Sequence, residues 1–338
     1  DAAPASRLLA AAADYLVTNP NAVNASNFVS LEDNLLYCEG SCIDELLAGT
    51  TNLYVPYANR VGLVIEATSE AVVDQVYNVV NAVRAVHGID LVHCIVTPER
   101  IGTRCRRNAA GAFVGTIDRP EVLFAACDEL VAAGVDAIAI TTNVQDLPSE
   151  AYAEHFRGEC PNPVGGVEAV LSHLVVGRYR LPAAHAPMVN VKELDLEDDV
   201  VDARGAGEMA SWSGLACVLI GLARAPRLEP RGRVRDAIGV ENVVAVVAPA
   251  SCLGGPPVIH AQHHGIPVIA VHGNETILDV TAERLGLRGV VEVGNYAEAA
   301  GVLLALTRGI SLDTIYRPLE TLRPVRVPAL MPAAAMAG

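Results

Sequence analysis

The sequence predicts an α/β protein built on a mostly parallel, Rossmann-like, doubly wound sheet that divides into two lobes. Short runs rich in β-branched residues alternate with segments of helical period, which is typical of parallel strands joined by crossover helices. The chain also has 338 residues, of which 51% are hydrophobic, and this is enough to build a large buried core. The same composition excludes a disordered chain.

The expected elements follow one another along the chain. β-Branched runs predict strands at Val61–Glu66, Leu91–Thr97, Asp136–Thr142, Val243–Ala248, Pro267–Val271 and Gly289–Val293. Helical periodicity predicts helices at Ser6–Val17, Ser69–Val86, Glu121–Ala133, Val167–Val176, Pro257–His264 and Tyr296–Thr307. Gly, Asn or Ser follows the later strands. Polar residues are therefore expected at the carboxyl edge, where open α/β sheets bind ligands.

Composition also suggests how the chain is divided. Residues 1–160 are expected to form an N-terminal α/β lobe and residues 161–326 a C-terminal α/β lobe. The stretch from 147 to 194 is rich in Pro, Gly and His and has little strand signal, so it is expected to connect the lobes or to form a site. Residues 327–338, rich in Ala and without charge, are expected to be an extended or disordered tail.

Charge and cysteine spacing argue against several functional classes. With 24 Lys and Arg against 39 Asp and Glu, the net charge of −15 disfavours a general nucleic-acid binder. The longest apolar runs, 215–223 and 243–250, fall short of the roughly 18 residues of a membrane helix, so no membrane partner is expected. The cysteines show no C-x-x-C spacing and no signal peptide is visible, which predicts a cytoplasmic protein with reduced thiols. Its apolar character favours a homo-oligomer, most simply a homodimer.

The clearest local signal is the glycine pair Gly254 and Gly255, between a predicted strand and a predicted helix. Backbone N–H groups and the helix dipole at such a turn can bind a phosphate or a carboxylate. Alternatively, the glycines serve only to make a tight turn. No Walker or G-x-G-x-x-G pattern is present, so the cofactor is unknown. The i, i+4 pair His260 and His264 lacks an acidic third ligand, and no metal site is predicted.

Glu168, His173 and His185 are the candidate catalytic residues. Glu168 and Ser172 are i, i+4 neighbours on one predicted helix, whereas His173 lies about 140° around the axis from Glu168 and cannot form an adjacent pair with it. His185 lies in a proline-bracketed segment that is interpreted as a rigid loop. Imidazole titrates near neutral pH, which suits proton transfer. A histidine that only bonds the backbone is the structural alternative.

Other polar residues are candidates for substrate binding. Asn274 and Thr276 follow the predicted strand at 267–271, and Arg104 belongs to a cluster of arginines that could hold an anion. Asn21 lies in a turn dense in side-chain amides, and Glu39 follows a predicted short strand. Each of these residues also has an ordinary reading as a helix cap, a turn residue or a solvated loop residue.

Several motifs together resemble a bacterial and plastid family of unknown function, DUF3326. They include ADYLVTNPNAVNASNF, YCEG, NRVGLVIEA, AAGVDAIAI, GGVEAVLSHLVV, PAAHAP, CVLIGLARAP, APASCLGGPPV, IPVIAVHGNETILDVT and NYAEAAGVLLALTRGI. The resemblance implies an α/β protein and a Gly-rich segment upstream of Asp1, and it brings no reaction. In similar sequences the recurrent motifs include His173, His185, Asn274 and Thr276. Cys252 and the histidines of HAQHH lie outside the recurrent motifs.

Three functions fit these residues. The favoured one is an enzyme of hydrolase or lyase type that acts on a small anionic metabolite by His and Glu acid–base chemistry. A nucleotide-sugar transferase or epimerase is the second, because the Gly-Gly turn and GIPVIAV resemble the C-terminal lobe of two-Rossmann-lobe glycosyltransferases. A non-catalytic small-molecule binding protein is the third. The residues expected to bind substrate are Gly254, Gly255, Asn274, Thr276, Ser172, Arg104, Asn21 and Glu39.

Overall fold

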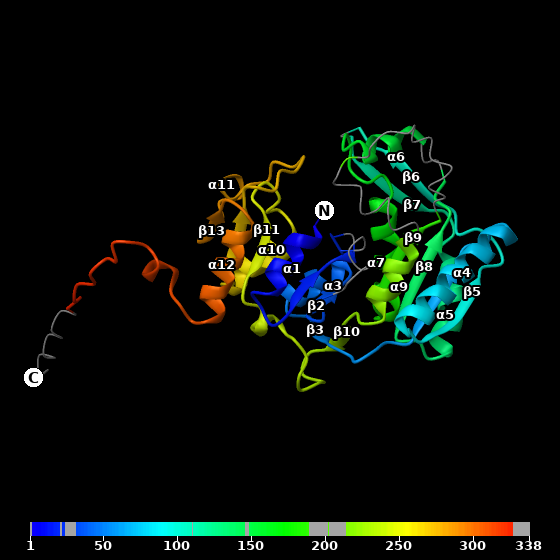
Figure 1. Cartoon of the computed structure of the whole chain (residues 1–338), viewed down its shortest axis with the longest axis horizontal. Coiled ribbons are helices and arrows are strands. Elements are labelled where there is room, and N and C mark those ends of the chain that lie inside the picture. The colour runs from blue at the N-terminus through cyan, green and yellow to red at the C-terminus, as the bar shows by residue number, and fades with distance from the viewer. Residues whose placement is uncertain are drawn as a thin grey trace, which may run out of the picture.

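The structure is a computed structural model that describes residues 2–20, 22–23, 32–109, 111–145, 149–188, 202 and 214–326. It has a mixed α/β fold in which the larger sheets are parallel and are packed against helices (Figure 1). The α/β class predicted from the sequence is confirmed.

The larger sheet has strands in the order β5-β4-β8-β9, all of them parallel. They are β4 (Val61–Ile65), β5 (Leu91–Val96), β8 (Ala137–Thr142) and β9 (Ala183–Pro187). Successive side chains of a strand point to opposite faces. In β4, Leu63 and Ile65 therefore join one apolar cluster and Val64 joins another. Since both faces are covered, nearly every position of β4 and β8 is apolar.

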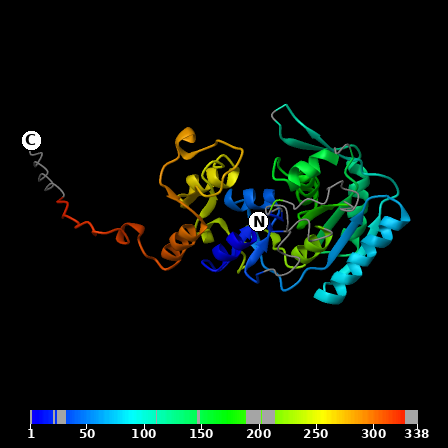
Figure 2. The same cartoon turned by 45° about the horizontal axis from the view of Figure 1, so that its top comes forward.

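Helices cover both faces of this sheet. Two of them, α4 (Glu70–His87) and α9 (Gly214–Leu222), pack on one face, and α5 (Pro120–Ala132) and α7 (Gly165–Tyr179) pack on the other. α4 forms because valines at three- and four-residue spacing make one buried stripe. It ends at Gly88, whose φ of 65° is left-handed. Figure 2 shows α4 lying along the outside of the sheet.

The second parallel sheet has the order β11-β12-β13. Its strands are β11 (Val246–Pro249), β12 (Val268–Val271) and β13 (Val290–Val293). The helices of this lobe are α10 (Pro256–His264), α11 (Ala282–Leu285) and α12 (Tyr296–Thr307). The N-terminal helix α1 (Ala3–Ala10) packs on α12, so the start of the chain belongs to this second lobe.

Smaller elements complete the fold. Strand β1 (Leu16–Thr18) pairs in parallel with β2 (Leu35–Tyr37), and β6 (Thr103–Arg107) forms an antiparallel hairpin with β7 (Phe113–Ile117). Further helices in the described ranges are α3 (Gly40–Leu47), α6 (Ser149–Phe156), η2 (Val240–Asn242) and η3 (Leu312–Thr314). Helix α3 lies between α7 of the first lobe and α10 of the second. One apolar cluster therefore runs through all three helices.

The antiparallel pair of β3 (Thr51–Tyr54) and β10 (Arg227–Pro230) marks where the chain enters and leaves the first lobe. The larger sheet is built from the segment between these two strands. The elements before β3 and after β10 pack with each other, through α1 with α12 and α3 with α10. In chain order the first lobe is thus an insertion within the second.

Most predicted elements are confirmed to within a few residues, and two differ. The helix expected at 6–17 is wrong at its end, because α1 stops at Ala10 and residues 16–18 form β1 beside β2. The segment around His185, interpreted as a rigid loop, is strand β9. Its small residues are buried between α7 and α9, where pairing with β8 satisfies their backbone groups.

The larger sheet also takes strands from both sides of residue 160, where the two lobes were expected to meet. The predicted tail, residues 327–338, lies outside the described residues. Within the described ranges, no helix is both long enough and apolar enough to cross a membrane.

Candidate functional site

The candidate site lies at the carboxyl edge of the larger sheet, on the face covered by α5 and α7. Val64, Ile140 and Ala183 lie in the apolar cluster of that face. Two residues further along the same strands, the side chains on this face are Glu66, Thr142 and His185. Strand periodicity thus changes an apolar layer into a polar one where the strands end.

A continuous series of polar contacts crosses this edge. Oε1 of Glu168, from the first turn of α7, lies 3.5 Å from Nδ1 of His185 on β9. Nε2 of His185 lies 2.9 Å from Oγ1 of Thr142 on β8. Oγ1 of Thr142 lies 3.0 Å from Oγ1 of Thr103 on β6. We call these four side chains, Glu168, His185, Thr142 and Thr103, the polar relay.

Burial differs along the polar relay. The side chain of His185 is fully buried, and both threonines are fully buried as residues. The Glu168 side chain retains 11% exposure and is therefore the solvent-facing end. Nδ1 of His185 has no hydrogen-bond partner in the described structure. An unsatisfied buried nitrogen is costly, and a small approach of the Glu168 carboxylate would satisfy it.

Glu66 holds the two threonines of the relay in place. Its buried carboxylate accepts hydrogen bonds from the backbone N–H of Gly102, at 2.9 Å, and of Asn143, at 2.7 Å. Gly102 directly precedes Thr103, and Asn143 directly follows Thr142. One carboxylate therefore fixes the backbone beside both hydroxyl groups. Bonds of this kind, to a charged acceptor, are stronger than those between neutral groups.

The β6–β7 hairpin is pressed onto the N-terminal turn of α7. A Cβ on Gly115 would lie 2.3 Å from Cα of Val167, and a Cβ on Gly166 would lie 2.8 Å from the carbonyl oxygen of Phe113. Both positions need glycine because backbone meets backbone there. On its other side the hairpin pairs with the end of β8, where the N–H of Gln145 donates to the carbonyl of Thr103 at 2.8 Å and brings Thr103 within reach of Thr142.

The structure brings together Glu168 and His185 among the predicted catalytic residues, and it places His173 elsewhere. His173 is exposed on α7 and lies near α3. There, burial and Glu39 raise the pKa of Asp44, and His260 and His173 partly offset that rise. The hydroxyl of Ser172 donates to the backbone carbonyl of Glu168 at 3.0 Å, a bond within the helix.

The predicted residues of the second lobe form a separate group at the carboxyl edge of the smaller sheet. Oγ1 of Thr276 lies 2.8 Å from Oγ of Ser251, and the amide of Asn274 donates to the hydroxyl of Tyr296 at 2.6 Å. Gly254 packs closely against Val280.

The helix N-terminus at this edge offers few anion-binding groups. Gly255 is the N-cap of α10. The first two residues of the helix, Pro256 and Pro257, have no N–H group, and the N–H of Val258 donates to the carbonyl of Gly255. The turn at Gly254 and Gly255 therefore has fewer free donors than its sequence suggests.

Two other predicted binding residues lie apart from the polar relay, and a third lies outside the described residues. Nε of Arg104 donates to Asp118 at 2.7 Å on the exposed side of the hairpin. The carboxylate of Glu39 caps α3 by accepting from the backbone N–H and the hydroxyl of Ser41. Asn21 lies outside the described residues.

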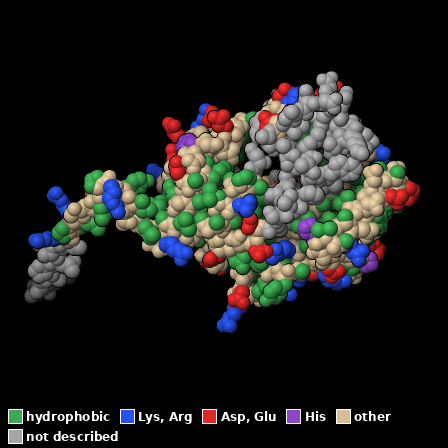
Figure 3. Space-filling view, in the orientation of Figure 1, with side chains coloured by type: hydrophobic (Ala, Val, Ile, Leu, Met, Phe, Trp, Pro, Cys, Tyr) green, Lys and Arg blue, Asp and Glu red, His purple; other side chains and the backbone are tan. Residues whose placement is uncertain are grey.

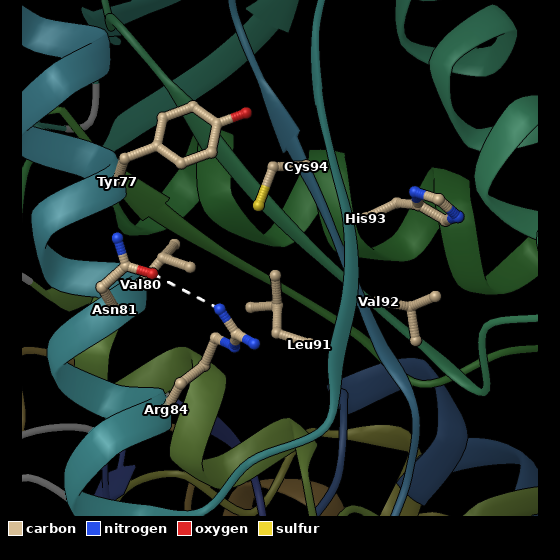
Figure 4. Close-up of a pocket in the computed structure, with 8 residues that line it drawn as sticks. All are labelled: Tyr77, Val80, Asn81, Arg84, Leu91, Val92, His93 and Cys94. Atoms are coloured by element: carbon tan, nitrogen blue, oxygen red, sulfur yellow. Dashed lines mark hydrogen bonds between the residues drawn. The ribbon is translucent and has the colours of Figure 1, made fainter.

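A shallow groove of about 190 Å³ opens on the other face of the sheet, between α4 and β5. Figure 4 shows Tyr77, Asn81 and Arg84 on the helix and Cys94 on the strand around it. The guanidinium of Arg84 donates to the side-chain oxygen of Asn81 at 3.4 Å. Burial raises the pKa of the Cys94 thiol to about 11, so it is not a reactive thiolate. None of the predicted site residues lines this groove.

Sequence reasoning missed Glu66, Thr103 and Thr142. Each lies at the end of, or next to, an apolar or mixed strand whose composition is ordinary. Glu66 gave the clearest signal of the three. It is a carboxylate directly after the apolar run Val61–Ile65, and the strand period of two places it on the same face as Val64. No group of three or more His, Cys, Asp or Glu side chains in the described part of the chain is placed to hold a metal ion.

Comparison with known proteins gives one informative relative. An uncharacterised lipoprotein of Synechococcus sp. is 34% identical over 313 residues, covering 92% of this chain and 86% of the relative. Its name as a lipoprotein contradicts the cytoplasmic location expected from the sequence. That expectation rested on the lack of a visible signal peptide. No solved structure matches the chain.

The family resemblance noted in the motifs extends over nearly the whole described fold. The profile of the family described as "Protein of unknown function (DUF3326)" matches residues 1–316, which include both lobes, the polar relay and the second-lobe group. The chain therefore belongs to the family DUF3326.

Proposed function

We propose that this protein is an enzyme that acts on a small anionic metabolite, a carboxylate or a phosphate, by proton transfer from the Glu168–His185 pair, in a reaction of hydrolase or lyase type. The observation that carries the proposal is the 3.5 Å approach of Glu168 Oε1 to His185 Nδ1, with Nδ1 otherwise unpartnered. Paired titratable groups at the carboxyl edge of a parallel sheet are typical of catalytic sites.

The contacts along the polar relay support a shared proton. One proton lies between His185 Nε2 and Thr142 Oγ1. A second proton, between His185 Nδ1 and Glu168 Oε1, gives the unpartnered nitrogen its hydrogen bond. That proton belongs either to Glu168 or to an imidazole N–H. Either member of the pair can therefore pass this proton on.

Glu168 is the group that meets the substrate in this proposal. It is the partly exposed end of the polar relay, whereas His185 is sealed behind it. When the shared proton lies on Glu168, the carboxyl group donates it to a leaving oxygen. When it lies on His185 Nδ1, the Glu168 carboxylate takes a proton from water or from carbon. Of the arginines of β6, Arg104 pairs with Asp118 and Arg107 with Glu154, while Arg106 is exposed and has no ion-pair partner among the described residues.

The fold proposed for this chemistry is a Rossmann-like, doubly wound one. The order β5-β4-β8-β9 and the helices on both faces support that assignment. In such sheets the ligand crevice lies where successive strands are wound to opposite sides, which here is between β4 and β8. Glu66 and Thr142 lie at the ends of those two strands.

A membrane-anchored location is part of the proposal. It is supported by the lipoprotein name of the Synechococcus relative. Fractionation of native cells tests it: we expect the protein in the membrane fraction and its release by detergent. Recovery in the fraction that contains no membranes would contradict this location.

The test of the function is a thermal-shift screen against small carboxylates, phosphate esters and uridine nucleotides, because a ligand that binds the folded chain raises its Tm. We expect a shift with a carboxylate or a phosphate ester. The hit is then incubated with the chain, and turnover is followed by proton NMR. We expect Glu168→Gln to lower turnover by about 100-fold or more and the exposed control Glu129→Gln to leave it unchanged.

Two results would contradict the proposal. Turnover that survives in both Glu168→Gln and His185→Phe would place the chemistry elsewhere. Binding of a uridine nucleotide that depends on Asn274 and Thr276, with no effect of Glu168→Gln, would favour the transferase alternative.

A further inference from the structure

The C-terminal segment beyond α12 is apolar, basic and exposed. Every residue from 313 to 326 is exposed. We define the arm as residues 315–326, whose large apolar side chains are 53% to 94% exposed and include Tyr316, Leu319, Leu322 and Val325. The guanidinium of Arg317 donates to carbonyls of Thr314 and Tyr316 within the same segment. Ile315 and Arg317 bond to η3, directly before the arm, and no hydrogen bond or ion pair in the described structure joins the arm to any other element.

A second surface of the chain has the complementary character. We define the acceptor loop as residues 275–285, which follow β12 and include α11. Ile277, Leu278 and Leu285 are exposed there, at 77%, 48% and 41%. The loop carries Glu275, Asp279 and Glu283 against one arginine, while the arm carries three arginines against one glutamate. Figure 3 shows acidic side chains over the end of the lobe that carries α11, and arginines on the arm.

The arm and the acceptor loop of one chain lie at opposite ends of the second lobe. Asn295 caps α12 at the carboxyl edge of the smaller sheet, the same edge from which the acceptor loop emerges. Twelve helical residues then carry the chain about 18 Å back. In Figures 1 and 2 the arm continues away from both lobes.

We propose that the arm of one chain binds the acceptor loop of a second copy of this chain. Apolar side chains on both surfaces would be buried, and the opposite charges would set the register. Leu304 of α12 and Ile310, which precede the arm, are 45% and 46% exposed. The exposed apolar surface therefore continues from the arm onto the second lobe, and the contact extends beyond the arm itself. This inference is independent of the chemistry proposed for the polar relay.

Photo-cross-linking tests the contact in the full chain. A benzophenone amino acid replaces Leu322 in one sample and Tyr57, which is also fully exposed but lies in the first lobe, in the control. A ¹⁵N-labelled copy is mixed with an unlabelled one. We expect cross-links from position 322 to peptides containing residues 275–285 of the other isotope, and no such products from position 57.

Sedimentation velocity measures the strength of the association. Leu322→Asp and the double variant Arg323→Glu/Arg326→Glu are expected to weaken self-association by about tenfold or more, with Tm unchanged because these side chains are exposed. Adding Glu275→Arg and Glu283→Arg to the double variant is expected to restore it. Tyr57→Asp is the matched control and should have no effect.

Three outcomes would overturn the proposal. The first is a chain that sediments as a monomer of 35.4 kDa at high micromolar concentration. The second is cross-linking from position 322 that stays within one isotope. The third is cross-linking to lipid, in vesicles of phosphatidylglycerol and phosphatidylethanolamine, in preference to a second chain, which would assign the arm to a membrane surface.

Discussion

Arg180 combines a strained backbone with an ion pair between lobes. It is the C-cap of α7 and has a φ of 57°, which a non-glycine residue rarely adopts. Its guanidinium donates to both oxygens of Glu45 on α3, at 2.8 and 2.7 Å. The ion pair stabilises the folded chain and the left-handed backbone destabilises it. Substitutions at residue 180 can separate these two effects on stability.

We expect Arg180→Gly to be more stable than Arg180→Ala by about 1 kcal/mol. Both variants lose the ion pair with Glu45, but glycine alone accepts the left-handed backbone without strain. Urea unfolding followed by circular dichroism measures the difference. Equal midpoints for the two variants would show that the backbone at residue 180 relaxes when the ion pair is lost.

The same ion pair predicts a dependence on pH. The hydrogen bond from Arg180 lowers the pKa of Glu45, against an opposing effect of burial, and a bond from Thr51 adds to the lowering. A lowered pKa in the folded chain gives stability that is present above the pKa of the unfolded chain, about 4.3, and is lost as pH falls through the folded value. The stability difference between the native chain and Arg180→Gly is therefore expected to shrink below about pH 4. Urea unfolding at pH 7 and pH 3 checks this, and a difference that grows on acidification would contradict it.

How far the site could be predicted depends on the residue. Glu168 and His185 were selected because a carboxylate and an imidazole suit proton transfer, but their 3.5 Å approach depends on β9 lying beside α7. Helical geometry correctly separated His173 from Glu168. Thr142 and Thr103 could not be singled out, because they meet through contacts between residues far apart in the chain, namely the Glu66 carboxylate and the pairing of β6 with Gln145 just after β8.

At the scale of elements, the contact of the β6–β7 hairpin with α7 has a strict steric requirement. A Cβ on Gly115 would overlap the backbone of Val167, whereas a Cβ on Gly177, in the same helix, meets nothing within 4 Å. We expect Gly115→Ala to destabilise the chain by about 2–4 kcal/mol. Gly177→Ala should stabilise it by about 0.5–1 kcal/mol, because alanine favours the helix.

Chemical denaturation measures the free energy of unfolding of both glycine variants. Amide exchange then tests the consequence for the site. The backbone N–H groups of Gly102 and Asn143, bonded to Glu66, should lose protection in Gly115→Ala and keep it in Gly177→Ala. Unchanged protection in both would mean that the hairpin contact does not hold the polar relay together.

The elements that were predicted well share a local cause. α4, α5, α10 and α12 are amphipathic or capped within their own sequences, and β4 and β8 are continuous apolar runs. The elements that were missed depend on partners. β1 forms only beside β2, and β9, composed of Ala, His and Pro, is a strand because β8 and two helices surround it.

At the scale of the whole molecule, α3 ties the two lobes into one apolar core. Leu46 and Leu47 on α3 are buried in the cluster that also contains Leu171 of α7 and Val258 of α10. We therefore expect the chain to unfold in a single cooperative transition. Leu46→Ala should lower the stability of both lobes together, by about 2–5 kcal/mol.

Two local probes distinguish a single cooperative transition from independent unfolding of the two lobes. Amide exchange on β8 reports the first lobe and exchange on β12 the second. Equal loss of protection in Leu46→Ala is the expected result. A loss confined to one sheet would show that the lobes unfold separately and that α3 belongs to only one of them.

The pairing of β3 with β10 brings the two ends of the first lobe side by side. The first lobe begins and ends at these neighbouring strands, and α3 and the Arg180–Glu45 ion pair join it to the rest of the chain as well. Loops of the first lobe that lie away from these contacts can lengthen or shorten without moving β3 and β10. The edge that carries the polar relay lies within this insertion, whereas the arm and the acceptor loop lie outside it, so a change of loop length in one leaves the other in place.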